Sequence, residues 1–194
     1  MNITQTEAEA ILAPFFERIT ECITSAIEEY KSMDAEKRSK FKKRTRANII
    51  NDFMVFNANR ELSNMSGILF SNWRGQFNVF IEDKFRLRFK KLDHRLRSSN
   101  IPTKPAQKFV NQIPEEMPGM PYPVTNIIAG YQWDNLQIGS QDVFLVCPDG
   151  KRNRGELKLS LFAVPGVTVS PTSDSQLLAT QTKRVAPKDS DKKF

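Results

Sequence analysis

The chain has 194 residues, of which 39% are hydrophobic, and this is enough to bury the core of one globular domain. Its 29 Lys and Arg residues exceed its 22 Asp and Glu residues, so the formal net charge of +7 favours an acidic partner such as nucleic acid. One histidine and two cysteines in no spacing motif exclude a His-rich metal site. Together with the lack of a bilayer-length apolar run, they predict a cytoplasmic protein with reduced thiols and no membrane partner.

Residues 1–62 are predicted to form a helical N-terminal segment. Within it, 6–31 places large apolar side chains on one stripe at helical spacing, and a Thr-x-x-Glu capping box can begin the helix at Thr4 or Thr6. This stripe either packs on the chain's own sheet or forms the interface of a homodimer.

A second stretch, 34–46, is strongly basic and nearly free of apolar residues. It leads into a third helix over about 46–62, which we expect Thr45 to cap. The buried candidates on the third helix are Ile49, Ile50, Phe53, Met54 and Phe56.

Residues 63–164 are predicted to form a β-rich body, because the apolar pattern changes there to a period of two. The predicted strands span 68–73, 77–82, 85–91, 124–133, 142–147 and 155–162, and Thr103 caps a short helix over about 104–112. Residues 165–194 are poor in large apolar side chains and are predicted to form a flexible, disordered tail. The sequence therefore predicts an α+β fold with N-terminal helices packed on about six mostly antiparallel strands.

The strand 85–91 alternates apolar and basic residues, so an extended backbone sends Phe85, Leu87 and Phe89 to one face and the basic residues to the other. Such a row of cations is able to hold phosphates, or it is an ordinary solvated strand face. The candidate nucleic-acid-binding residues are Arg86, Arg88, Lys90, Lys91, Arg95, Arg97, Lys42, Lys43, Arg44 and Arg46. Four strand aromatics, which stack on bases or fill the core, are Trp73, Phe80, Tyr131 and Trp133.

The last predicted strand carries Glu156-Leu-Lys158, the spacing of a metal-dependent nuclease site with Asp142 or Asp149 as a second carboxylate. The alternative is structural, since alternation turns Leu157 inward and leaves the charged pair on the surface. Gly-rich phosphate loops, H-E-x-x-H and CxxC pairs are absent from the sequence, and we expect neither a cofactor nor a bound metal.

Four motifs resemble a family of uncharacterised bacterial and prophage proteins over about residues 45–161. They are RFKKLD at 88–93, LRSSNIPT at 96–103, IAGY at 128–131 and VFLVCP at 143–148. Genes of that family often lie beside those of phage-type repressors and H-E-x-x-H zinc peptidases. The resemblance implies a role in prophage, stress or phage-defence regulation and a protein partner encoded nearby, but it implies no catalytic residues.

The leading hypothesis is a non-enzymatic regulatory or mobile-element-associated protein that binds nucleic acid or a partner protein through a cationic surface. One alternative is a metal-dependent nuclease that uses Glu156, Lys158 and Asp142. Another is an inhibitor or antitoxin-like partner of a zinc peptidase. Salt-sensitive binding without turnover, magnesium-dependent cleavage and a stoichiometric protein complex would distinguish these hypotheses in turn.

Overall fold

The computed structural model describes residues 3–98, 103–133 and 142–159. All of them belong to one of the two units into which the chain divides, Met1–Val164. The predicted tail over 165–194 lies outside the described residues. The predicted fold class is confirmed, because N-terminal helices pack on a mixed, mostly antiparallel sheet of six strands.

The predicted helix 6–31 is divided into two α-helices. They are α1 (Gln5–Leu12) and α2 (Phe16–Ser32), separated by the 3₁₀ turn η1 (Ala13–Phe15). Pro14 lies in this turn, where its missing N–H removes a helical hydrogen bond. The capping box forms at Thr4, whose N–H donates to Glu7 Oε2 at 2.9 Å while the Glu7 N–H donates to Thr4 Oγ1 at 3.3 Å.

Two further helices follow, α3 (Ala35–Ser39) and α4 (Lys43–Glu61). The predicted cap at Thr45 is wrong. Lys42 is the N-cap of α4, and no side chain caps the amides of its first turn. The predicted burial of Phe56 on α4 is wrong as well, because 63% of this residue is exposed.

The six strands are hydrogen-bonded in the order in which they occur in the sequence. They are β1 (Ile68–Trp73), β2 (Gln76–Ile81), β3 (Phe85–Leu92), β4 (Thr125–Gln132), β5 (Val143–Asp149) and β6 (Arg152–Lys158). All neighbours are antiparallel except β3 and β4, which are parallel and are joined through α5 (Lys104–Val110). Thr103 caps α5 as predicted, accepting from the Ala106 N–H at 3.4 Å.

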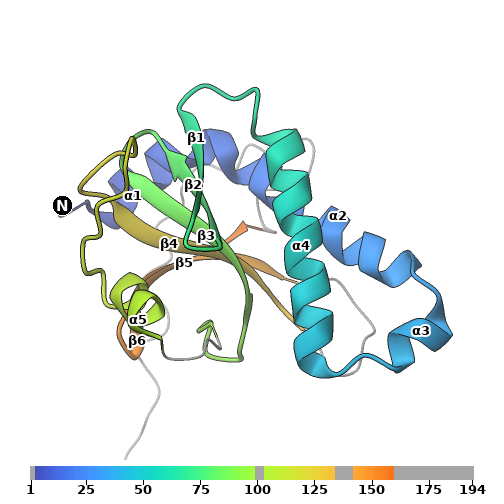
Figure 1. Cartoon of the computed structure of the whole chain (residues 1–194). Coiled ribbons are helices and arrows are strands. Elements are labelled where there is room, and N and C mark those ends of the chain that lie inside the picture. The colour runs from blue at the N-terminus through green and yellow to red at the C-terminus, as the bar shows by residue number, and fades with distance from the viewer. Residues whose placement is uncertain (1–2, 99–102, 134–141, 160–194) are drawn as a thin grey trace, which may run out of the picture. The chain divides into compact units, whose positions relative to one another are not determined.

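One face of the sheet packs on the N-terminal helices. Figure 1 shows α2 and α4 side by side against the sheet, with α5 apart from them. Buried residues of α1, α2 and α4 share a single core with Leu87, Ile127 and Leu145 of the sheet. The apolar stripe of 6–31 is therefore covered by the chain's own sheet and α4, which is the first of the two predicted alternatives.

The opposite face has a smaller core beneath α5. Phe109 of this helix packs on Leu92, Ile128 and Val146, which lie on β3, β4 and β5. Because both faces of the central strands are covered, every side chain of β3 from Phe85 to Phe89 is buried, including the basic ones.

Gly130 of β4 allows β3 and β4 to approach closely, and we expect Gly130→Ala to destabilise the fold by about 2 kcal/mol. A Cβ at this position would clash with the Lys90 carbonyl oxygen and lie 2.7 Å from Leu92 Cγ. Thermal and urea unfolding measure the loss. Gly155→Ala in β6 is the matched control, because its Cβ would meet nothing closer than Gln5 Oε1 at 3.9 Å. A change of under about 0.5 kcal/mol in both variants would contradict the close approach at Gly130.

Candidate nucleic-acid interface

The basic residues of β3 are divided between the two faces of the sheet, and the face they share with α5 is closed. The alternation is as predicted, but the expectation of a solvent-facing row of cations is wrong for its first two members. Arg86 is 2% exposed and Arg88 is 6% exposed, because α5 lies over them, while Lys90 on the same face is half-buried. Two of the predicted phosphate-binding residues are thus interior residues.

The two buried guanidinium groups are held by side chains that belong to no motif of the sequence. Asn78 Oδ1 accepts from Nε of both Arg86 and Arg88 at 2.8 Å. The Phe109 ring lies 4.2 Å from the Arg88 guanidinium carbon, a cation–π contact. Glu115 Oε2 lies 3.4 Å from Arg86 Nη1 and forms an ion pair with it.

Electrostatics oppose this burial. Burial lowers the pKa of Arg86, and burial followed by the charge of Arg86 lowers that of Arg88. Burial also lowers the pKa of Lys90, with a further contribution from Arg88. Both guanidinium groups nevertheless stay protonated at neutral pH. Two buried positive charges therefore share one carboxylate, which makes Glu115 important for stability.

We expect Glu115→Gln to reduce the free energy of unfolding by about 2 kcal/mol, since it removes the charge that offsets Arg86. Urea unfolding at neutral pH measures the change. Glu116→Gln is the matched control, because Glu116 is exposed and one position along the chain. Equal stability of the two variants would show that the Arg86–Glu115 pair contributes nothing.

Lys91 lies on the opposite face from Lys90 and joins the basic start of α4. Burial lowers its pKa, and the nearby charges of Arg46 and Lys43 lower it further. We call Lys91 and the four basic residues Lys42, Lys43, Arg44 and Arg46 the α4 basic surface. Lys42, Lys43 and Arg44 are exposed, and the first turn of α4 contains no acidic residue. The structure therefore brings Lys91, Lys43 and Arg46 together at the junction of β3 and α4, with Lys42 and Arg44 adjacent to Lys43 in the chain.

Two predicted residues lie in the turn after β3. Arg97 donates to Asp93 through Nη2 at 3.1 Å and through its backbone N–H at 2.9 Å, which engages the side chain locally. Arg95 is exposed, and its backbone N–H donates to the same carboxylate at 2.8 Å. Asp93 thus organises this turn and offsets part of its charge.

The four strand aromatics have different environments. Phe80 and Tyr131 are core residues, at 1% and 0% exposure. Trp73 and Trp133 are partly exposed, and each is covered by an arginine: Arg74 lies 5.4 Å from the Trp73 ring centroid and Arg46 lies 5.0 Å from that of Trp133. The second pair adds an aromatic ring to the α4 basic surface, and the sequence alone did not connect Arg46 with Trp133.

The Glu-x-Lys residues lie on β6, an edge strand of the sheet. Glu156 is exposed and accepts from Asn153 Nδ2 at 2.8 Å, while Lys158 Nζ lies 2.8 Å from Asp142 Oδ1. Lys158 and Asp142 are 37% and 40% exposed, so their ion pair is a surface pair of small energetic value. Within the described ranges, no three His, Cys, Asp or Glu side chains are grouped closely enough to hold a metal ion.

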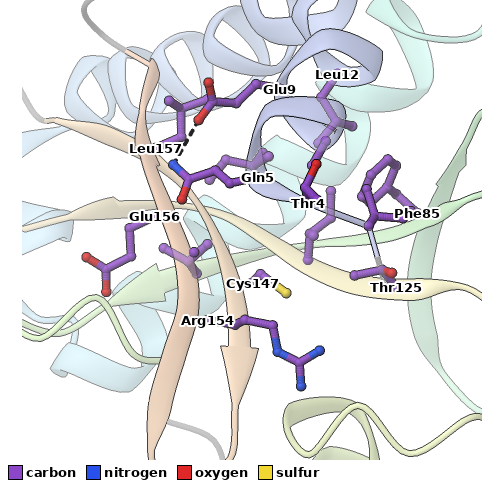
Figure 2. A pocket seen from close by; sticks show the side chains of 16 residues that line it. Thr4, Gln5, Glu9, Leu12, Phe85, Thr125, Cys147, Arg154, Glu156 and Leu157 are labelled. Carbon is purple, nitrogen blue, oxygen red and sulfur yellow. Dashed lines mark hydrogen bonds between the residues drawn. The ribbon is translucent and has the colours of Figure 1, made fainter. Parts of the chain in front are cut away.

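An apolar pocket of about 100 Å³ lies between α1 and strands β4 to β6. Figure 2 shows its lining, with Gln5 and Glu9 of α1 joined by a 2.8 Å hydrogen bond and with the Cys147 thiol on the opposite wall. Burial raises the pKa of Cys147, so this thiol is not an activated nucleophile. Cys22 is less reactive still, because burial raises its pKa to about 12.

Comparison of the chain with protein-family models, with curated proteins and with solved structures finds no match. In the part of the chain that the structure describes, no helix is both long and apolar enough to cross a membrane.

Proposed function

We propose that this protein binds nucleic acid through the α4 basic surface and acts as a non-enzymatic regulator. The observation that supports this most directly is the proximity of Lys91, Arg46 and Lys43, where burial lowers the pKa of Lys91 and the two like charges lower it further. Surface cations in folded proteins usually alternate with carboxylates. Here two of the acidic residues nearest in sequence are already paired, Glu36 with Lys40 at 2.7 Å and Asp93 with Arg97 at 3.1 Å, and Asp52 lies six residues beyond Arg46 on α4. A polyanion would supply the missing negative charge.

The start of α4 adds a second favourable feature. Its first amides have no side-chain cap, and the helix dipole places partial positive charge at this end. A phosphate oxygen near Lys42 and Lys43 would interact with both the lysines and the helix terminus. Contacts of this kind position a nucleic acid without reading its sequence, so they account for affinity and not for sequence preference.

The family resemblance gives this proposal a biological context. A nucleic-acid-binding protein encoded beside a phage-type repressor would act in prophage, plasmid or stress regulation. A protein partner encoded nearby is part of the same proposal. The arginines under α5 are not used in this scheme, because they are buried within the fold.

We expect the double substitution Lys42→Gln with Lys43→Gln to weaken nucleic-acid binding and to reduce the slope of log affinity against log salt by roughly two, because two phosphate contacts are lost. Fluorescence anisotropy with a labelled oligonucleotide, repeated over a series of salt concentrations, measures both effects. The matched control is Lys104→Gln with Lys108→Gln on α5, which removes the same charge from two exposed lysines.

Two results would count against the proposal. Equal losses in the two double variants would mean that net charge alone drives binding. No measurable binding by the unaltered protein at low salt would remove nucleic acid as the partner.

A further inference from the structure

A pocket of about 500 Å³ lies beside the α4 basic surface, between the end of α2, α3 and the last residue described after β4. Tyr30 and Trp133 form its aromatic wall, and Arg38 and Arg46 supply its positive charge. Its volume lies within the range of small-molecule sites, about 300–1,000 Å³. It therefore has room for a flat ring with a charged group attached.

The aromatic wall is held rigidly. Tyr30 meets the Trp133 ring edge-to-face, with centroids 6.0 Å apart and planes at 80°. Tyr131 meets the same ring at 6.2 Å and 70°. Trp133 is fixed by two edge contacts yet stays partly exposed, so it provides a preformed stacking surface.

The cations around the pocket differ in how far they are already engaged. Lys31 is paired with Glu28 at 2.8 Å, and Arg38 Nε donates to the Met33 carbonyl at 3.0 Å. Arg46 lies over Trp133, and its Nε has no hydrogen-bond partner. Arg46 is thus the cation that is best placed to bind an incoming anion.

Two more buried polar atoms beside Arg46 lack a partner, namely Trp133 Nε1 and the Tyr131 hydroxyl. Tyr131 is 0% exposed. Burial raises its pKa while the charge of Arg46 lowers it, so the hydroxyl lies within the field of that guanidinium. Indole and guanidinium N–H groups only donate, so a ligand bound against Trp133 and Arg46 is favoured when it is rich in acceptors. Phosphate oxygens and base edges meet this requirement.

The second arginine–tryptophan pair of the chain shows which feature matters. Arg74 also lies over a tryptophan, Trp73, whose Nε1 is unpartnered. The Arg74 side chain, however, is 63% exposed, and its Nη1 lies 3.8 Å from the Glu115 carboxylate. Arg46 instead has Lys91 and Lys43 as charged neighbours. The two arginines stack on tryptophan in the same way, but the one at Trp73 lies near a carboxylate, whereas the one at Trp133 lies among cations.

We propose that the Trp133 pocket takes one unpaired nucleotide of a single-stranded nucleic acid, with the base against Tyr30 and Trp133 and a phosphate at Arg46. This inference rests on the proposed function, because the neighbouring phosphates of the same strand lie on the α4 basic surface. A base that is paired and stacked within a duplex cannot enter a pocket of this size. The protein therefore prefers single strands to duplexes.

The test uses the full chain carrying Trp73→Phe, which leaves Trp133 as the one tryptophan of the two in the sequence. Titration with a mixed-sequence single-stranded oligonucleotide should quench its fluorescence, whereas the duplex of the same sequence should bind without quenching. In the otherwise unaltered chain, Trp133→Leu should lower the ratio of single-strand to duplex affinity about tenfold. Trp73→Leu, at the other arginine–tryptophan pair, should leave this ratio unchanged.

A second variant protects the test against loss of folding. Ala35 is exposed and lines the pocket, so Ala35→Phe would occupy part of the cavity while Tyr30 and Tyr131, which pack against Trp133, are retained, and it should lower the same ratio. Equal affinity for single strand and duplex, with no quenching and no effect of Ala35→Phe, would overturn the pocket proposal and leave the α4 basic surface standing. Absence of binding to either nucleic acid at low salt would overturn both.

Discussion

The position of β3 in the middle of the sheet controls where the charges of this protein lie. β3 pairs with β2 on one side and with β4 on the other, so its side chains have to be accommodated on two covered faces. On the helix face this is straightforward, because Phe85, Leu87 and Phe89 join the main core. On the α5 face it requires Asn78, Phe109 and Glu115 to surround two guanidinium groups. The fold depends on this arrangement because a buried charge without partners is strongly destabilising.

The same geometry determines which basic residues remain for a ligand. The arginines under α5 are occupied inside the protein and hold the crossover between β3 and β4 against the sheet. Lys91 emerges on the other face, at the end of the strand, where it meets the start of α4. A chain with a large excess of positive charge thus contains one group of cations with a structural role and another group for which we propose a binding role.

Much of the fold follows from the periodicity of the sequence. Every predicted strand is present to within a few residues in the described ranges, because alternation over five or more residues is a strong signal. Pro14 interrupts the first helix because its missing N–H removes a helical hydrogen bond, and the chain forms a 3₁₀ turn there. Phe56 shows the limit of this reasoning, since its place on α4 depends on a packing partner and not on spacing.

The candidate site was only partly predictable. Alternation separates the two faces of β3 but does not show which face is exposed to solvent. The helix α5, which covers one face, is followed by a proline-rich stretch, 111–124, that has no periodic pattern. Glu115 and Asn78 are single polar residues with no surrounding motif, so nothing in the sequence indicated their role. The position of Lys91 could have been predicted from the sequence. It lies two residues after Phe89 in the same strand, so its side chain belongs on the same face of the sheet, the one covered by the helices.

The central claim is that nucleic acid binds where α4, Lys91 and Trp133 meet. Amide and indole resonances of the labelled protein, recorded during titration with a single-stranded oligonucleotide at low salt, test it most directly. The α4 basic surface predicts that shifts concentrate at residues 42–46, at Lys91 and at the Trp133 indole N–H, while the Trp73 indole N–H does not move. Shifts centred on Glu156 and Lys158, or a titration that leaves the Trp133 indole and the start of α4 unchanged, would contradict it.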